Sequence, residues 1–375
     1  MSTLSSTLRF PEFSGEWKMC TIGELITKVG SGVTPRGGEA VYKTEGHPFV
    51  RSQNVGLGNL LLDDIAFIDE ETHLRQKNTE LQFNDVLLNI TGASIGRSAL
   101  VDKQIVGGNV NQHVCIIRTK ENLVPSFICS FLLSNYGQRQ IDSFQAGGNR
   151  QGLNFEQIKS IKITIPSKDE QIKIAKLLRA IDERIATQNK IIEKLQSLIK
   201  GIAQNVARNN KPNIRLSECL ECSSSTLQES DVCKNGTYPV YGANGIVGYL
   251  DNYNTEKEAV YIIKDGSGVG TVSYVTGKCS ATGTLNTLQA KEGYSLQYLY
   301  YMLKVFNFEP YKTGMAIPHI YFKDYGKAKI FCPSYTEQLK YARLLSAIDN
   351  KLSAEQSILT DLSLQKQYLL RQMFI

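Results

Sequence analysis

A segment of 20 residues occurs twice in this chain of 375 residues, and it constrains the fold more than any other feature. The first copy runs from Pro166 to Ile185 and the second from Pro333 to Leu352, an offset of 167 positions. The copies align without a gap and are identical at 11 of the 20 positions. A long repeat at one fixed offset indicates that a structural unit has been duplicated.

Both copies open long segments in which apolar residues recur three and four positions apart. That spacing, sustained over four or more heptads, is typical of a coiled-coil seam. The predicted seam residues are Ile174, Leu178, Ile181, Ile185, Ile192, Leu195, Leu345, Ile348, Leu352, Leu359 and Leu362. Polar residues interrupt the pattern at Gln188, Glu355 and Lys366. Because a lone helix would expose its apolar stripe to water, we expect the two helices to pair with each other. The alternative is that each helix packs only on its own domain.

Each helical segment also carries a start signal. Ser167 and Ser334 are N-cap candidates, and an acid follows three residues later, Glu170 in the first copy and Glu337 in the second. Serine followed by glutamate at this spacing is typical of a capping box, in which the two residues satisfy free N–H groups of the first helical turn. The sequence therefore predicts that both helices begin just after these serines.

The regions before the two helices read as mixed α+β domains. We predict one domain at residues 1–165 and another at 211–332, alternating with helical regions at 166–210 and 333–375. In the first domain we expect a short helix from Ile22 to Val29 and a glycine-rich turn from Gly30 to Gly38. Residues around Ser98–Val101 are expected to form a strand. The length of the chain also favours two or more domains.

Composition points to a cytoplasmic protein outside the membrane. The apolar runs fall short of a transmembrane span, and the first residues lack the features of a signal peptide. The eight cysteines do not have the spacing typical of a disulfide-rich domain, which favours a reducing compartment. Cys219 and Cys222, with Cys233 downstream, leave a zinc site open, but no second pair follows and we expect none. The net charge of +6 is compatible with a polyanionic partner.

Taken together, the motifs resemble the specificity (S) subunit of type I restriction–modification systems. The pattern P-S-x-x-E-Q-x-K-x-A-x-L-L-x-A-I-D starts at Pro166 and again at Pro333. Further matches are Gly30-x-Gly32-x-Thr34-Pro35, the stretch from Tyr238 to Gly245, and the glycine loops at 92–96 and 266–270. The resemblance implies two target-recognition domains, with the helices paired antiparallel as a spacer between them.

The same resemblance implies partners and cofactors. The partners would be double-stranded DNA, two modification (methyltransferase) subunits that use S-adenosylmethionine, and two ATP- and Mg-dependent restriction subunits. This chain itself would bind no cofactor and would not be an enzyme.

Catalytic motifs in the sequence agree with that expectation. The chain has no P-loop and no Pro-Pro dipeptide, so the Asn-Pro-Pro-aromatic motif of adenine methyltransferases is missing. Gly92-Ala93-Ser94-Ile95-Gly96 matches the G-x-S-x-G sequence pattern of the nucleophile elbow in hydrolases. That elbow, however, needs a helix directly after it. We expect a strand there, and the repeat places Gly268 at the position of Ser94. A tight turn is therefore the better interpretation.

DNA contacts are expected from polar side chains on glycine-rich loops, since loops can enter a groove while the core stays rigid. Arginine is the preferred reader of guanine, and asparagine or glutamine of adenine. The candidates are Arg36, Arg51, Gln53, Asn54, Ser94, Asn111, Gln112, Asn149, Arg150 and Gln151 in the first domain, and Asn244, Lys264, Ser267, Asn286, Lys312 and His319 in the second. For any one of them taken alone, a solvated loop residue is the simpler interpretation.

Two other functions stay open at this point. One is an S-like subunit of a methylation-only or type IIB-like system. The other is a coiled-coil adaptor whose two α+β domains bind protein. Loss of DNA binding at high salt would distinguish a DNA-binding subunit from such an adaptor, because phosphate contacts weaken as salt rises.

Overall fold

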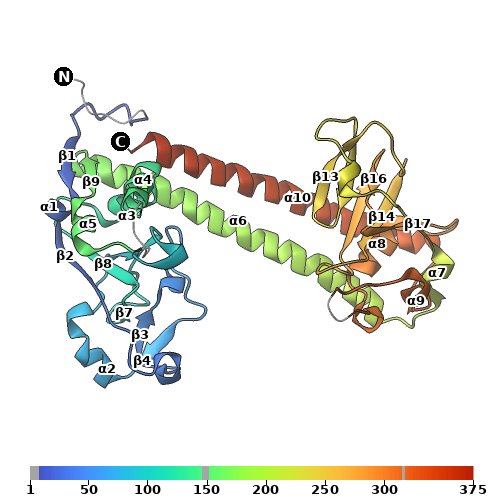
Figure 1. Cartoon of the computed structure of the whole chain (residues 1–375), viewed down its shortest axis with the longest axis horizontal. Coiled ribbons are helices and arrows are strands. Elements are labelled where there is room, and N and C mark those ends of the chain that lie inside the picture. Colours follow the sequence, from blue (N-terminus) through green and yellow to red (C-terminus); the bar gives the residue numbers. More distant parts are fainter. Residues whose placement is uncertain (1–7, 146–151, 315–316, 375) are drawn as a thin grey trace. The chain divides into compact units, whose positions relative to one another are not determined.

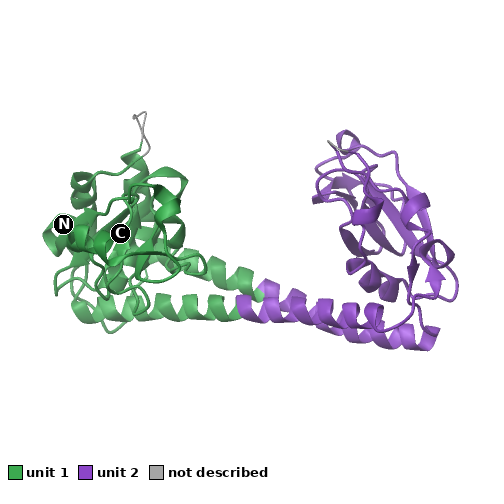
Figure 2. Ribbon diagram, turned by 90° about the horizontal axis from the view of Figure 1, so that it is seen from below, with its two compact units in different colours: residues 1–188, 358–375 green, residues 189–357 purple. Residues whose placement is uncertain are grey.

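The computed structural model describes residues 8–145, 152–314 and 317–374. It divides into two compact units (Figure 2), one formed by residues 1–188 and 358–375 and the other by residues 189–357. Each long helix contributes one part to each unit.

Unit 1 contains the first α+β domain and the neighbouring parts of both long helices (Figure 1). Its elements are β1 (Lys18–Thr21), α1 (Ile22–Leu25), β2 (Ile26–Ser31), η1 (Gly38–Val41), β3 (His47–Val50), η2 (Ser52–Asn54), β4 (Ala66–Ile68), α2 (Glu70–Arg75), η3 (Lys77–Thr79), β5 (Val86–Asn89), η4 (Gly92–Ser94), β6 (Ser98–Leu100), β7 (Asn109–Val110), β8 (Val114–Thr119), α3 (Pro125–Leu133), α4 (Asn135–Ser143), α5 (Phe155–Ser160), β9 (Lys162–Ile165) and the start of α6 (Lys168–Arg208). The strands form a four-stranded sheet in the order β2-β8-β5-β6, a three-stranded sheet β4-β3-β7, and the pair β1-β9.

Unit 2 repeats this plan. Its elements are the end of α6, then β10 (Ile214–Arg215), α7 (Leu216–Cys219), β11 (Leu220–Ser224), η5 (Glu229–Asp231), β12 (Tyr238–Gly242), β13 (Gly245–Leu250), β14 (Glu258–Ile263), β15 (Val272–Thr276), β16 (Ser280–Ala281), β17 (Leu285–Ala290), α8 (Leu296–Lys304), η6 (Glu309–Tyr311), α9 (Phe322–Tyr325), β18 (Lys329–Ile330) and the start of α10 (Tyr335–Gln372). Its sheets have the orders β11-β17-β14-β15, β13-β12-β16 and β10-β18. In both units the three-stranded sheet contains one parallel pair, β3-β7 or β12-β16. The duplication predicted from the helices therefore extends through both domains.

The long helices pair antiparallel. In unit 1, Ile174 and Leu178 near the start of α6 share a core cluster with Leu369 and Met373 near the end of α10. In unit 2, Ile199 near the end of α6 and Leu352 in the first half of α10 line one cavity of about 460 Å³. All predicted seam residues are buried or half-buried. The predicted α+β domains with two paired long helices are thus confirmed.

Packing against the domain completes each helix pair. In unit 1 the ring of Phe374, just after α10, lies 5.2 Å from the ring of Phe127 on α3. The amide oxygen of Gln171 on α6 accepts from the backbone N–H of Val124, 2.9 Å. Gln338, at the equivalent place on α10, accepts in the same way from the N–H of Ser295 in unit 2, 2.9 Å. Helix pairing and packing on the domains therefore occur together, rather than as alternatives.

Two local predictions differ from the structure. The helix expected from Ile22 to Val29 ends at Leu25, and Ile26–Ser31 is strand β2. The β-branched residues of this stretch suit a strand, and the ladder with β8 outweighs the local helical pattern. At Ser334 only the glutamate half of the capping box forms, because the N–H and the Oγ of Ser334 both donate to the Glu337 carboxylate. In the first copy, Glu170 instead accepts two hydrogen bonds from Arg9, each 2.7 Å.

Candidate nucleic-acid interface

In the first domain, four loops that carry candidate residues leave the sheets at one edge. Strand β8 runs antiparallel to both β2 and β5, so the ends of β2 and β5 lie beside the start of β8. Strands β3 and β7 run parallel and end together. The loops that follow these ends or precede β8 are 32–37, 51–54, 90–97 and 111–113. Sheet topology therefore gathers side chains from distant parts of the sequence.

Arg51, Gln53 and Asn54 converge on the carboxylate of Asp64. Arg51 Nη2 donates to the Asp64 carbonyl oxygen, 2.6 Å, and Gln53 donates to the carboxylate. Asn54 is fully buried: its Oδ1 accepts from the N–H of Arg51, 2.9 Å, and its Nδ2 donates to Leu61 and Asp64. Asn54 therefore shapes the loop and has no surface to offer a base, which corrects the prediction for that residue.

The other candidates of the first domain differ in exposure. Arg36 and Gln112 are exposed, and Gln112 contacts Thr34 and His113. Asn111 is buried, and its Oδ1 accepts from the N–H of His113, 3.0 Å, so it too supports the loop. The remaining candidates Asn149, Arg150 and Gln151 lie outside the described residues.

Ser94 is half-buried at the end of the short turn η4. Its Oγ accepts a hydrogen bond from Asn89 Nδ2, 3.1 Å. Strand β6 follows at Ser98, as the sequence predicted, so the strand-to-helix geometry of a nucleophile elbow is not formed. The glycines on either side have positive φ angles, 71° at Gly92 and 84° at Gly96, which explains why the turn needs them.

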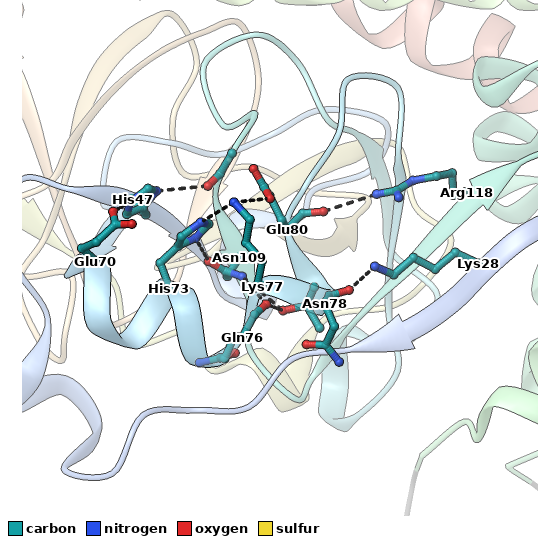
Figure 3. A network of polar contacts seen from close by, with 12 residues as sticks. Lys28, His47, Glu70, His73, Gln76, Lys77, Asn78, Glu80, Asn109 and Arg118 are labelled. Carbon is teal, nitrogen blue, oxygen red and sulfur yellow. Dashed lines mark hydrogen bonds and ion pairs between the residues drawn. The ribbon is translucent and has the colours of Figure 1, made fainter.

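Behind these loops lies a buried polar network that sequence reasoning did not find (Figure 3). His73 is buried, and its Nδ1 lies 2.7 Å from Asn109 Oδ1. Asn109 Nδ2 donates to the carbonyl oxygen of Gln76, 2.9 Å, and to Thr79 Oγ1, 3.2 Å. The ring of His47 stacks on that of His73 with centroids 3.8 Å apart. The network fixes Gln76, whose own amide oxygen accepts from the N–H of Val33, 3.0 Å.

In the second domain the candidates surround the equivalent sheet edge. Asn244 lies exposed in the turn between β12 and β13, and Ser267 lies exposed after β14. His319 Nδ1 lies 2.7 Å from Asp265 Oδ1, and the backbones of the two residues form a bridge. Lys264, beside Asp265, is half-buried.

Two further candidates of the second domain are engaged within the fold. Lys312 Nζ is paired with Glu309, 2.6 Å. Asn286 is only 4% exposed. Its Oδ1 accepts from Ser224 Oγ, 2.9 Å, and its Nδ2 donates to Tyr325, 3.3 Å. Asn286 therefore joins β11 to the core, which corrects its prediction as a base reader. A hydrogen-bond partner on a neighbouring strand cannot be identified from a local sequence motif.

The three cysteines considered for zinc do not meet. Burial raises the pKa of Cys219 to about 12, and its thiol donates to the carbonyl oxygen of Leu216, 3.4 Å. Burial likewise raises the pKa of Cys222 to about 11. Cys233 is exposed and its backbone pairs with Tyr249 on β13. Within residues 8–145, 152–314 and 317–374, no three His, Cys, Asp or Glu side chains are arranged to hold a metal ion.

Among the described residues, no helix combines the length and the apolar character needed to cross a bilayer.

Comparison with known proteins identifies the fold's relatives. A putative type I specificity subunit of Mycoplasma genitalium is 25% identical to this chain over 320 residues, 78% of this chain and 81% of that protein. The EcoKI specificity subunit of Escherichia coli K12 is 22% identical over 202 residues, 51% of this chain and 41% of that longer protein.

Solved structures agree on the fold. The crystal structure of an S subunit of a type I restriction–modification system from M. genitalium superposes with a TM-score of 0.68, at 19% identity, covering 99% of both chains. A chain from a study of assembly and conformational transition in a type I system gives 0.54, at 16% identity, covering 94% of this chain and 96% of that one. The family model described as type I restriction modification DNA specificity domain matches residues 14–197 and 212–363. The chain therefore belongs to the family of type I restriction–modification specificity subunits.

Proposed function

We propose that this chain recognises a bipartite, asymmetric DNA site and positions methyltransferase and restriction subunits on it, without catalysing a reaction itself. One observation carries the proposal: two domains share the same three sheets in the same strand order, yet present different side chains on the loops at the equivalent edge. A duplicated scaffold with diverged loops suits two half-sites of different sequence.

The proposed DNA contacts are the candidates that keep an exposed or partly exposed surface. They are Arg36, Arg51, Gln53, Ser94, Gln112, Asn244, Lys264, Ser267, Lys312 and His319. Asn54, Asn111 and Asn286 are removed from that set because they are buried and bonded within the fold. Asn149, Arg150 and Gln151 stay as predictions from the sequence.

Partners would supply the chemistry. Two methyltransferase subunits using S-adenosylmethionine and two ATP- and Mg-dependent restriction subunits are the complement that membership of the family suggests. The proposed domains, 1–165 and 211–332, would each recognise one half-site, with the helical regions 166–210 and 333–375 as the spacer.

Electrophoretic mobility shift of the chain with its modification subunits tests the proposal. We expect sequence-selective binding that weakens steeply as salt rises from about 50 to 200 mM, because each phosphate contact releases counterions. Salt-insensitive binding to protein and none to DNA would instead identify an adaptor. A complex that methylates DNA but never acquires a restriction subunit would identify a methylation-only system.

A further inference from the structure

The loop 32–37 of the first domain is held at three successive residues. A Cβ on Gly32 would lie 1.7 Å from the carbonyl oxygen of Val110, so only glycine fits at this close approach. The N–H of Val33 donates to the amide oxygen of Gln76, 3.0 Å, and Gln76 is only 8% exposed. The N–H of Thr34 donates to the amide oxygen of Gln112, 2.8 Å, and the Thr34 hydroxyl contacts the same oxygen. The loop is thus fixed from behind by two glutamines.

The hydrogen bonds of Gln112 are consistent with a single arrangement of protons. Its oxygen must face Thr34, which offers a backbone donor, so its Nε2 faces His113 Nε2 at 3.1 Å. The imidazole therefore accepts at Nε2 and carries its proton on Nδ1, which contacts the hydroxyl of Thr91. Gln112 and His113 consequently join the loop to Thr91, which lies just after β5.

Arg36 lies in a tight turn just beyond this anchored segment. The N–H of Gly38 donates to the carbonyl oxygen of Pro35, 3.1 Å. Gly37 has φ 103° and ψ −8°, the conformation that a type II turn requires at its third residue. Arg36 is exposed and has no hydrogen-bond or ion-pair partner among the described residues. The fold therefore presents an unneutralised guanidinium on a fixed turn.

The second domain anchors its equivalent loop in another way. Ser31 pairs with Cys115 in the first domain, and Ser224 pairs with Asn286 at the equivalent place in the second. Counting along the chain from these pairs, Leu227 corresponds to Thr34 and Gly283 corresponds to Gln112. There the backbone N–H of Gly283 donates directly to the carbonyl oxygen of Leu227, 2.7 Å. The loop is thus held by the Gln112 side chain in the first domain and by a backbone–backbone hydrogen bond in the second.

We propose that Gln112, supported by His113, is a positioning residue that holds the loop 32–37 so that Arg36 neutralises a phosphate of the DNA backbone. This inference rests on the proposed DNA-recognition function. It changes the role of Gln112 from a reader of bases to a support for a phosphate contact, and it adds Gln76, Thr34 and His113 to the functional residues.

The test is the salt dependence of DNA binding by the complete complex with its modification subunits. Arg36→Gln should make the slope of log K against log salt shallower by about 0.9, the value for one phosphate contact. Gln112→Ala should make it shallower by a similar amount although it removes no charge, and the double variant should show no further change. Lys103→Gln and Gln104→Ala, both on the exposed turn between β6 and β7, are matched controls that should leave the slope unchanged.

Thermal unfolding of each variant serves as the check on folding. If Gln112→Ala keeps the wild-type slope while Arg36→Gln does not, Gln112 is not a positioning residue. If Arg36→Gln keeps the wild-type slope, Arg36 meets no phosphate. Either result overturns the inference while the proposed function survives. Absence of salt-sensitive DNA binding in the wild-type complex would instead refute the proposed function itself.

Discussion

The two domains have the same strand order but differ in the polar contacts that stabilise their sheets. In the first, the buried carboxylate of Asp85 accepts two hydrogen bonds from Arg118, each 2.7 Å, across the β5–β8 pair. Val86 pairs with Ile117 in the first domain, and Val260 pairs with Leu288 in the second. This register places Ala259 at the position of Asp85 and Gln289 at the position of Arg118. Ala259 is buried and apolar. The sheet order therefore does not depend on the ion pair, and each domain stabilises it locally.

The polar contacts of the helix pair also differ between the two units. Asp182 on α6 forms an ion pair with Lys366 of α10, 2.6 Å, and Lys366 also donates to the carbonyl oxygen of Leu57, 3.3 Å. At the repeat-related positions of unit 2, Asp349 accepts from the hydroxyl of Tyr301, 3.3 Å, and the place of Lys366 is taken by buried Ile199. The interruption of the seam at Lys366 is therefore a polar contact specific to the first domain.

Breaking the ion pair gives the largest expected difference between the domains. Asp85→Ala leaves Arg118 without its partner beside the sheet, and removal of one member of a buried pair costs about 3–5 kcal/mol. The side chain of Arg118 is 24% exposed, so we expect the lower end of that range. Hydrogen exchange should show loss of protection in unit 1 while unit 2 keeps its protection. Equal loss in both units would contradict local stabilisation.

Removing a buried leucine at equivalent positions of the two helices should destabilise the two units by similar amounts. Leu178→Ala and Leu345→Ala each remove a buried leucine from the helix pair, which costs about 2–4 kcal/mol. We expect the first variant to reduce hydrogen-exchange protection in unit 1 and the second in unit 2. As a control, Leu344→Ala changes an exposed neighbour and should have little effect. An effect of Leu344→Ala as large as that of Leu345→Ala would contradict the observed seam.

Removing the polar contact specific to the first domain should have a smaller effect. Lys366→Ala is expected to cost about 1 kcal/mol, because Asp182 is partly exposed and water can replace the lost partner. Lys340→Ala, an exposed lysine of the same helix, should change stability by less than about 0.5 kcal/mol. Urea denaturation of both variants makes the comparison, and identical midpoints would show that the Lys366 contact adds nothing.

Much of this architecture could be predicted because the helices carry a periodic apolar signal and occur twice. Local patterns could not show long-range partners. Glu170 follows Ser167 as in a capping box. Its carboxylate nevertheless accepts a hydrogen bond from Arg9, which lies 161 residues away in the sequence. Asn54 and Asn286 look like base readers until the structure shows them buried. Ile26 and Val29 fit a helical pattern, but pairing with β8 makes them strand.

The smallest predicted difference is in cysteine reactivity. The three cysteines of the first domain, Cys20, Cys115 and Cys129, are all buried, whereas Cys233 of the second is exposed. Iodoacetamide reacts with thiolates, and burial raises the pKa of Cys222 to about 11, so this half-buried thiol stays protonated at pH 8. Peptide mapping after brief labelling of the folded chain should find Cys233 modified first. Faster labelling of Cys115 would show that the first domain opens readily.

If two diverged domains read two different half-sites, the DNA motif that the complex methylates consists of two unlike parts. The chain is expressed with its modification subunits in a host without other methyltransferases, and modified bases are mapped across the genome. We predict one motif made of two short defined sequences of different composition, separated by a spacer of unspecified bases. A continuous or palindromic motif would show that the two domains do not read two different half-sites.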